Sequence, residues 1–401
     1  MSWKTVSIGE ITKVVTKGTT PKVFLDSGVN YIKAEALNGD SSLNSKRFYF
    51  IDEQTHESLR RSQLDDGDVL LTIAGAQIGK CGYVKDSYLP ANTNQAVGIM
   101  RLDKNKAIPK FIYYFFKQKK IFQLIQGLNS QAAQPNINLT MLKQIKLQIP
   151  KHSIQQKITS TLSTYDDLIE NNRRRIQLLE ESARLLYKEW FVNFRFPGHE
   201  NIRIVDGVPE GWKTGCASDI LDVMSGGTPK TKVSDYWDGE IPFFTPKDAT
   251  DTPYVLSTEK TLSEEGLKKC NSKFYPKNTI FITARGTVGK LNLAQKSMAM
   301  NQSCYALKAK APLNQLFLYS ALEASIAQFK SRASGAVFDA IVVDTFKFIQ
   351  LITPPKILIS KFTEIAEPIF TQIEILLIQN QKLAKARDLL LPRLMTGEVE
   401  V

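Results

Sequence analysis

One stretch of the sequence decides the fold: ITSTLSTYDDLIENNRRRIQLLEESARLLYKEW, residues 158–190. Its apolar residues recur at alternating steps of four and three, which is the spacing of a heptad repeat. The resulting seam comprises Ile158, Leu162, Tyr165, Ile169, Asn172, Ile176, Leu179, Ala183, Leu186 and Trp190. The stretch therefore predicts one long helix whose seam packs against a second helix.

A second stretch repeats this pattern 204 residues later. Its seam comprises Phe362, Ala366, Ile369, Ile373, Leu376, Asn380, Leu383, Arg387, Leu390 and Leu394. Each seam thus contains one asparagine, Asn172 in the first and Asn380 in the second. Because an unpaired amide in an apolar layer costs about 1 to 3 kcal/mol, we expect these two side chains to face each other and to set the register.

Pairing Asn172 with Asn380 fixes every other layer of an antiparallel pair. The numbers of facing residues then add to 552, as 172 and 380 do. The remaining layers are Ile169 with Leu383, Ile176 with Leu376, Leu179 with Ile373, Ala183 with Ile369, Leu186 with Ala366, and Trp190 with Phe362. We therefore predict an intramolecular antiparallel coiled coil in this register. The alternative is that each helix is amphipathic and is buried separately against its own domain.

The second helix contains a proline near its end, Pro392. Proline lacks the N–H group that a helix interior needs, so we expect the helix to stop near Leu391. The layer that would pair Ile158 with Leu394 is therefore not expected to form.

The chain consists of two copies of one module, because motifs of the first half return in the second at offsets of 204 to 210 residues. The repeated motifs are WKT at 3–5 and 212–214, GTTPK at 18–22 and GGTPK at 226–230, TIAGAQIGK at 72–80 and ITARGTVGK at 282–290, and NQ at 94–95 and 301–302. Each module therefore consists of a globular region followed by a long helix.

The globular regions mix strand and helix signals. Short β-rich runs at 69–73 and 280–283 alternate with helical stretches such as 111–125, with Gly, Pro and Asn between them. We predict an α+β fold in which two mixed α/β domains, at 1–150 and 198–354, are separated by two helical regions at 151–197 and 355–401. The duplication relates the two halves by a pseudo-two-fold axis.

The composition limits what the chain can bind. Its 401 residues include 52 Lys and Arg against 40 Asp and Glu, a net charge of +12, which favours an anionic partner such as nucleic acid or a membrane. Four dispersed cysteines and three histidines exclude a disulfide scaffold and argue against a zinc site. The longest apolar runs are far shorter than the roughly 18 residues of a membrane span, and the first ten residues lack an apolar signal-peptide core. We therefore expect a cytoplasmic protein.

Longer motifs end the helical regions and open the globular ones. LLYKEWFVNFRFPGHE at 185–200 and LLLPRLMTGEVEV at 389–401 close the two helical regions, and WKTVSIGEI at 3–11 and the GTTPK and GGTPK motifs lie near the starts of the domains. In these motifs, and in its alternation of globular and helical regions, the chain resembles the specificity (S) subunits of type I restriction-modification enzymes. The QPNI motif at 134–137 is replaced by FDAI at 338–341. An equivalent role for the second loop is therefore not assumed.

The resemblance implies that 1–150 and 198–354 are target recognition domains, each reading one half of a bipartite, asymmetric DNA site. The helices would act as a ruler, since the 33 residues from Ile158 to Trp190 span about 50 Å. It also implies a non-catalytic subunit that binds double-stranded DNA and docks two modification (methyltransferase) subunits and restriction (translocase and endonuclease) subunits. S-adenosylmethionine, ATP and Mg are then expected on those partners, and no cofactor is expected in this chain.

The repeated loops supply the residue types that contact DNA. Lys and Arg suit phosphates and guanine, and Asn and Gln suit adenine. We expect DNA contacts from Lys22, Lys33, Gln77, Lys80, Asn94 and Gln95 in the first domain and from Lys230, Lys247, Arg285, Thr287, Lys290, Asn301, Gln302 and Arg332 in the second. The competing interpretation is that these are glycine-bearing turns with solvated cations and ordinary turn amides.

Other functions have less support in the sequence. The loop at 75–80 lacks the Walker spacing, and Cys81 follows its lysine, which argues against ATP binding. The isolated histidines offer no nucleophile–base pair for an enzyme. The alternative function is a coiled-coil scaffold whose globular domains bind other proteins. Composition and periodicity support DNA binding and scaffolding about equally. The family resemblance favours DNA binding.

Overall fold

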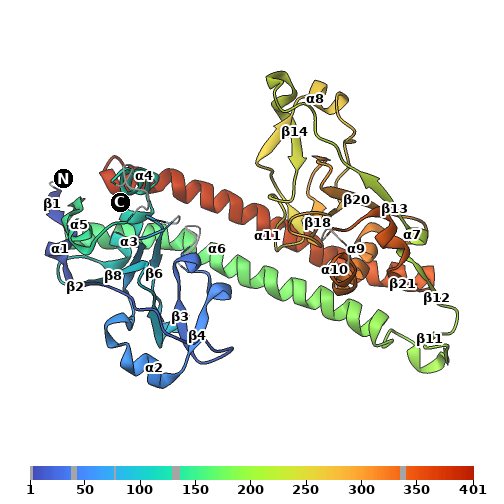
Figure 1. Cartoon of the computed structure of the whole chain (residues 1–401), viewed down its shortest axis with the longest axis horizontal. Coiled ribbons are helices and arrows are strands. Elements are labelled where there is room, and N and C mark those ends of the chain that lie inside the picture. Colours follow the sequence, from blue (N-terminus) through green and yellow to red (C-terminus); the bar gives the residue numbers. More distant parts are fainter. Residues whose placement is uncertain (1–2, 38–42, 76–77, 129–135, 335–339) are drawn as a thin grey trace. The chain divides into compact units, whose positions relative to one another are not determined.

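A computed structural model describes residues 3–37, 43–75, 78–128, 136–334 and 340–401. The chain forms two compact units: Met1–Glu170 with Gln381–Val401, and Asn171–Asn380. Each unit therefore joins one globular region to parts of both long helices (Figure 1).

The first unit contains mixed helix and sheet. Its strands are β1 (Lys4–Ser7), β2 (Thr12–Lys17), β3 (Val29–Ile32), β4 (Tyr49–Ile51), β5 (Val69–Thr72), β6 (Cys81–Tyr83), β7 (Ala91–Thr93), β8 (Val97–Leu102) and β9 (Lys146–Ile149). Its helices are α1 (Ile8–Ile11), α2 (Glu53–Ser58), α3 (Pro109–Lys117), α4 (Lys119–Gly127), α5 (Leu139–Gln144) and α6 (His152–Tyr187), the last of which continues into the second unit. The sheets have the orders β2-β8-β5-β6 and β4-β3-β7, and β1 pairs with β9.

The buried strand β5 organises the core of this unit. Its residues are all buried, because the run is apolar apart from a terminal threonine. Val69 packs on the same side as Phe111 of α3, whereas Leu70 belongs to a second core on the other side. The stretch predicted as one helix at 111–125 forms two helices, α3 and α4, which meet at Gln118.

The second unit repeats this arrangement. Its strands are β10 (Ile204–Val205), β11 (Val208–Pro209), β12 (Lys213–Cys216), β13 (Leu221–Ser225), β14 (Trp237–Phe244), β15 (Tyr254–Val255), β16 (Lys260–Leu262), β17 (Ile280–Thr283), β18 (Leu291–Ala294), β19 (Ala299–Met300), β20 (Cys304–Ala309) and β21 (Gln350–Thr353). Its helices are α7 (Ala217–Ile220), α8 (Glu264–Lys268), α9 (Gln315–Ala324), α10 (Ile326–Ser334) and most of α11 (Lys356–Thr396).

Strand pairing confirms the duplication. The order β13-β20-β17-β18 corresponds to β2-β8-β5-β6, and β16-β14-β19 corresponds to β4-β3-β7. The parallel pair of β3 with β7 returns as β14 with β19, and β12 pairs with β21 as β1 does with β9. In the second unit the larger sheet also contains β15, which pairs in parallel with β18.

Helices α6 and α11 pack along their predicted seams within the second unit. Asn172 Nδ2 donates to Asn380 Oδ1 at 3.0 Å. The ring centroids of Trp190 and Phe362 lie 6.4 Å apart. Buried residues of one core lie between these contacts: Ile176, Ala183, Ala366, Ile373 and Leu376. The predicted register is therefore confirmed at the asparagine pair and at the Trp190–Phe362 layer.

The end of α11, in the first unit, differs from the prediction. The helix continues through Pro392 to Thr396, so an end near Leu391 is wrong. Leu391 and Leu394 are buried in the same core as Ile158. Burying each of these leucine side chains stabilises the folded chain by about 1.5 to 3 kcal/mol. This gain offsets the loss of the hydrogen bond that proline cannot make.

A buried ion network ties α3 to both long helices in the first unit. Arg387, a seam position only 3% exposed, places Nη1 2.6 Å from Asp166 Oδ1. Lys117 Nζ lies 3.5 Å from the same oxygen, and the Tyr114 hydroxyl donates to Asp166 Oδ2 at 2.6 Å. Burial alone would raise the pKa of Asp166, but Lys117, Tyr114 and Arg387 hold it below its ordinary value. The carboxylate is therefore charged and shared by two buried cations.

Candidate nucleic-acid interface

The described residues of the repeated TIAGAQIGK and ITARGTVGK segments close equivalent hairpins in the two units. The Thr72 N–H donates to the Lys80 carbonyl at 2.8 Å, and the Thr283 N–H donates to the Lys290 carbonyl at 3.0 Å. Each loop contains two glycines with positive φ, namely Gly75 and Gly79 in the first and Gly286 and Gly289 in the second. Since glycine adopts this conformation without strain, the motif places its lysine at the same point of both loops.

The Asn-Gln turns lie beside these loops. The Ile73 N–H donates to the Ala96 carbonyl at 2.8 Å, and the Ala284 N–H donates to the Ser303 carbonyl at 2.8 Å. Each Asn-Gln turn is therefore tied to its hairpin loop by an equivalent backbone hydrogen bond.

The Gly-Thr-Pro turns pack closely on the same Asn-Gln turns. A Cβ atom at Gly18 would lie 2.0 Å from the Thr93 carbonyl oxygen, and one at Gly226 would lie 2.2 Å from the Asn301 carbonyl oxygen. Only glycine fits these positions. Three repeated motifs thus converge in each unit, and we call each set a motif cluster: residues 18–22, 73–80 and 94–95 in the first unit, and 226–230, 284–290 and 301–302 in the second.

A fourth repeated segment also reaches each hairpin loop. The Ile137 N–H donates to the Ile73 carbonyl at 2.8 Å, and the Ile341 N–H donates to the Ala284 carbonyl at 2.9 Å. These two segments hold equivalent backbone positions although QPNI and FDAI differ in sequence. Residues 129–135 and 335–339 lie outside the described residues.

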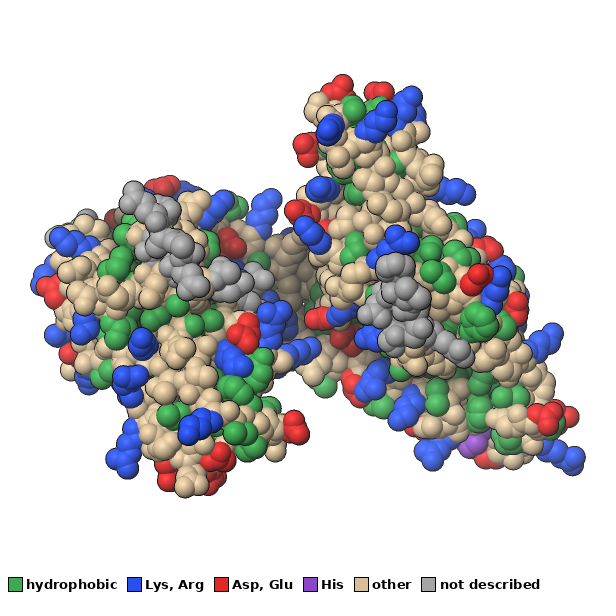
Figure 2. Space-filling view, viewed as in Figure 1, with side chains coloured by type: hydrophobic (Ala, Val, Ile, Leu, Met, Phe, Trp, Pro, Cys, Tyr) green, Lys and Arg blue, Asp and Glu red, His purple; other side chains and the backbone are tan. Residues whose placement is uncertain are grey.

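Most predicted cations are available for contact. Lys22, Lys230, Lys247 and Arg285 are exposed and Lys80 is half-buried, and none of the five lies within ion-pair distance of a carboxylate of the described residues. On the face shown in Figure 2, Lys and Arg side chains are scattered over each unit rather than gathered in one patch. This distribution suits many separate phosphate contacts.

Two predicted cations have partners within the chain. Lys33 Nζ lies over the rings of Phe24 and Tyr49, 4.2 and 3.4 Å from their centroids. Lys290 Nζ forms an ion pair with Asp251 Oδ1. Gln77 lies outside the described residues, and Arg332 is placed on α10 without a described side chain.

The predicted amides differ between the units. In the first unit, Asn94 Oδ1 is buried without a hydrogen-bond partner among the described residues, and Gln95 is exposed. In the second, Asn301 Oδ1 accepts from the Ser303 N–H at 3.0 Å and Gln302 Oε1 accepts from the Thr228 hydroxyl. Thr287 is exposed, and its carbonyl accepts from the Thr283 hydroxyl. The same turn therefore presents different groups in the two clusters.

Sequence reasoning missed Asp251, which lies against the second motif cluster. It belongs to the segment before β15, whose sequence does not repeat a motif of the first half, so a search for repeated residues could not find it. The signal in the sequence is a short polar run, DATDT at 248–252.

Metal and membrane sites receive no support from the described part of the chain. No three His, Cys, Asp or Glu side chains there come together as metal ligands. Among its helices, none has the combined length and apolar character that crossing a bilayer requires.

Comparison with known proteins identifies the family. The sequence model described as "Type I restriction modification DNA specificity domain" matches residues 1–181 and 209–385. The MjaIX specificity subunit of Methanocaldococcus jannaschii is 27% identical, over 99% of this chain and 93% of that protein. The HindI specificity subunit of Haemophilus influenzae is 24% identical, over 99% of each. The crystal structure of a type I S subunit from M. genitalium shares the fold, with a TM-score of 0.60 at 16% identity over 98% of this chain and 96% of that one. The chain therefore belongs to the family of type I restriction-modification specificity subunits.

Proposed function

We propose that the two motif clusters are the DNA-reading surfaces and that each unit reads one half of a bipartite, asymmetric site. The target recognition domains would be residues 1–150 and 198–354. The observation that carries this proposal is the convergence of three repeated motifs, distant in sequence, at one place in both units. A shared backbone with different side chains suits two readers with different target sequences.

The long helices would set the gap between the half-sites. We propose that α6 and α11, within 151–197 and 355–401, form one antiparallel coiled coil along their whole seams. The Asn172–Asn380 hydrogen bond supports this, because it joins the two residues that the heptad pattern pairs.

Specificity subunits of type I systems are non-catalytic, and the catalytic activities lie in their partner subunits. We propose that this chain assembles with two methyltransferase subunits that use S-adenosylmethionine. Restriction subunits that use ATP and Mg would join this complex, which would act in the cytoplasm. The role of this chain is then to hold the DNA while a partner reaches the target adenine.

The proposal is tested by binding of the assembled complex to duplexes. A DNA reader binds one bipartite sequence about 10³ to 10⁷ times more tightly than unrelated DNA, and its affinity falls steeply with salt. Binding that persists in high salt, with equal affinity for all duplexes, would instead support the protein-binding scaffold.

Two lysines of the first motif cluster should contribute to phosphate binding. Replacing Lys22 and Lys80 together by alanine should weaken binding to all sequences alike and reduce the slope of log K against log[salt] by about 2, since each phosphate contact contributes about 0.9. Lys104→Ala is the matched control. Lys104 follows the C-terminal end of β8, whereas the Asn-Gln turn of the motif cluster precedes its N-terminal end. An equal loss in the control would show a general charge effect and contradict the assignment.

Exposed leucines on α6 suit a docking site for a methyltransferase subunit. Leu178 is 68% and Leu185 44% exposed, and their spacing of seven places them on one face of the helix. Leu178→Glu with Leu185→Glu should abolish or strongly reduce assembly, as measured by native mass spectrometry of the mixed subunits. Gln177→Glu is the control for added charge. Normal assembly of the leucine double variant would place the docking site elsewhere.

A further inference from the structure

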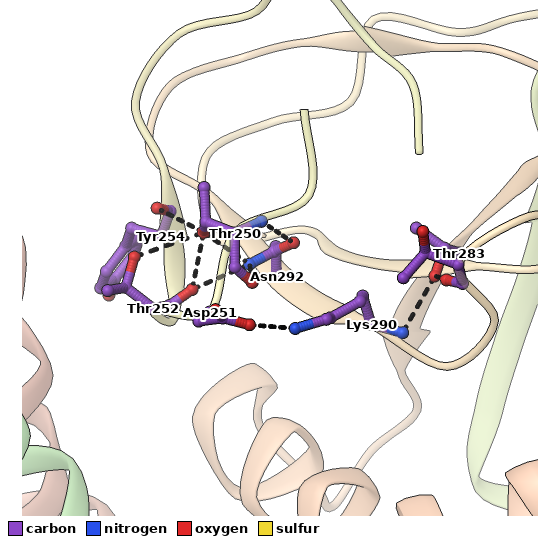
Figure 3. Close-up of polar contacts among 8 residues, drawn as sticks. Thr250, Asp251, Thr252, Tyr254, Thr283, Lys290 and Asn292 are labelled. Atoms are coloured by element: carbon purple, nitrogen blue, oxygen red, sulfur yellow. Dashed lines mark hydrogen bonds and ion pairs between the residues drawn. The ribbon is translucent and has the colours of Figure 1, made fainter. Parts of the chain in front are cut away.

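A carboxylate, that of Asp251, lies against the second motif cluster. Asp251 Oδ1 accepts from Lys290 Nζ, and the two side chains stay 78% and 37% exposed (Figure 3). Phosphates repel a carboxylate, so Asp251 does not serve the sequence-independent grip on the DNA backbone. A carboxylate at this surface can instead accept hydrogen bonds from donor groups on the edges of bases.

The residues on both sides of Asp251 are held in place by hydrogen bonds to Asn292. Asn292 of β18, which is fully buried, donates to the carbonyls of Thr250 and Thr252 at 3.2 and 2.8 Å. Asn292 Oδ1 accepts from the Thr250 N–H at 3.2 Å. Because both residues that flank Asp251 are hydrogen-bonded to Asn292 of β18, the backbone at Asp251 is held in place before any ligand arrives, and the ion pair with Lys290 orients its carboxylate (Figure 3).

The described residues of the first unit lack this arrangement. Gly82 of β6 pairs with Leu70 of β5. At the equivalent position of the second unit, Asn292 of β18 pairs with Phe281 of β17. No carboxylate of the described residues lies within ion-pair distance of Lys80, the counterpart of Lys290. Within the residues that the structure describes, a buried asparagine that holds the backbone around an aspartate is therefore found in the second unit.

We propose that Asp251 reads the exocyclic amino group of one base, cytosine N4 or adenine N6, in the half-site of the second unit. This inference rests on the proposed function. In the major groove these amino groups are the hydrogen-bond donors that a carboxylate can accept from. Lys290 is the positioning residue: its ammonium orients the carboxylate and offsets the repulsion from nearby phosphates.

The test uses the complex of the full chain with its methyltransferase subunits. Binding is measured on duplexes in which each base pair of both half-sites is replaced in turn. The wild-type complex should discriminate at one C or A position by roughly 5- to 150-fold through this contact, and Asp251→Ala should reduce that preference to about twofold while leaving the other positions unchanged. Asp251→Asn, a smaller change, should alter the preferred base at the same position. Lys290→Met should keep the preferred base and lower its discrimination.

Base analogues separate the two amino-group donors. Purine in place of adenine, or pyrimidin-2-one in place of cytosine, removes only the amino group. The analogue of the base actually read should weaken binding by the wild-type complex and leave binding by Asp251→Ala unchanged.

Asp222→Ala is the matched control, because Asp222 forms another exposed Asp–Lys pair in this unit, 3.7 Å from Lys310. The inference is overturned if Asp251→Ala keeps every base preference, if it weakens all positions equally, or if Asp222→Ala changes the same position. A wild-type complex with no sequence preference would overturn the proposed function and this inference with it. A bipartite preference that Asp251→Ala leaves intact would overturn the inference alone.

Discussion

Asp166→Ala is expected to destabilise the first unit by about 3 to 5 kcal/mol. The change removes the carboxylate that Arg387 and Lys117 share, and both cations are nearly inaccessible to water. It also deprives the Tyr114 hydroxyl of its acceptor. Hydrogen exchange of α3, together with calorimetry of the whole chain, should detect the loss, because α3 carries two of these residues.

Asp167→Ala is the control for this prediction, since Asp167 is the exposed neighbour on the same helix. It should change stability by no more than about 0.5 kcal/mol. Replacing Asp166, Arg387 and Lys117 together by apolar residues of similar size should be neutral or stabilising by about 1 to 4 kcal/mol. A loss below about 1 kcal/mol in Asp166→Ala would show that the network does not hold α3 to the long helices.

Deleting residues 173–179 together with 373–379 is expected to shorten the gap between the two half-sites by about three base pairs. These two heptads face each other in the predicted register, so their removal keeps Asn172 opposite Asn380. Seven residues account for about 10 Å of helix, and one turn of B-DNA, 10 to 10.5 base pairs, spans about 34 Å. The measurement is binding to duplexes whose half-sites are separated by gaps of different length, because the deletion also removes Leu178 of the proposed docking site and would affect methylation through assembly.

Two further variants make the deletion interpretable. Removing only 173–179 moves the first seam out of register and should abolish tight binding to duplexes of every gap length. Glu374→Gln controls for the lost ion pair with Lys277, whose Nζ lies 2.7 Å from Glu374 Oε1, and should leave the gap unchanged. A gap that keeps its length in the matched deletion would contradict the role of the helices as a ruler.

The sequence was sufficient to predict the duplication and the helix register. Repeated motifs require only that two halves share a backbone, and strand pairing confirms that they do. The register followed from one polar residue in each seam, because an amide buried among apolar side chains needs a partner at the same level. Both inferences use repetition within the sequence: motifs that return in the second half, and a heptad spacing within each helix.

Contacts between distant, unrepeated segments could not be predicted in this way. Arg387 is a charge in the predicted seam, and its partner Asp166, which comes from the middle of α6, is shared with Lys117 of α3. Pro392 was expected to end α11, but burial of its neighbours outweighs the lost hydrogen bond. Residue type identified Lys33 as a candidate DNA contact, yet only the fold shows its ammonium over two aromatic rings.

The claim that two units read two half-sites is tested most directly by sequencing the host genome for methylated adenines, with and without this protein. The account predicts a motif of two different half-sites separated by a fixed number of unread base pairs, and predicts that this motif vanishes when the protein is absent. A contiguous motif, or a bipartite one that persists without the protein, would contradict it.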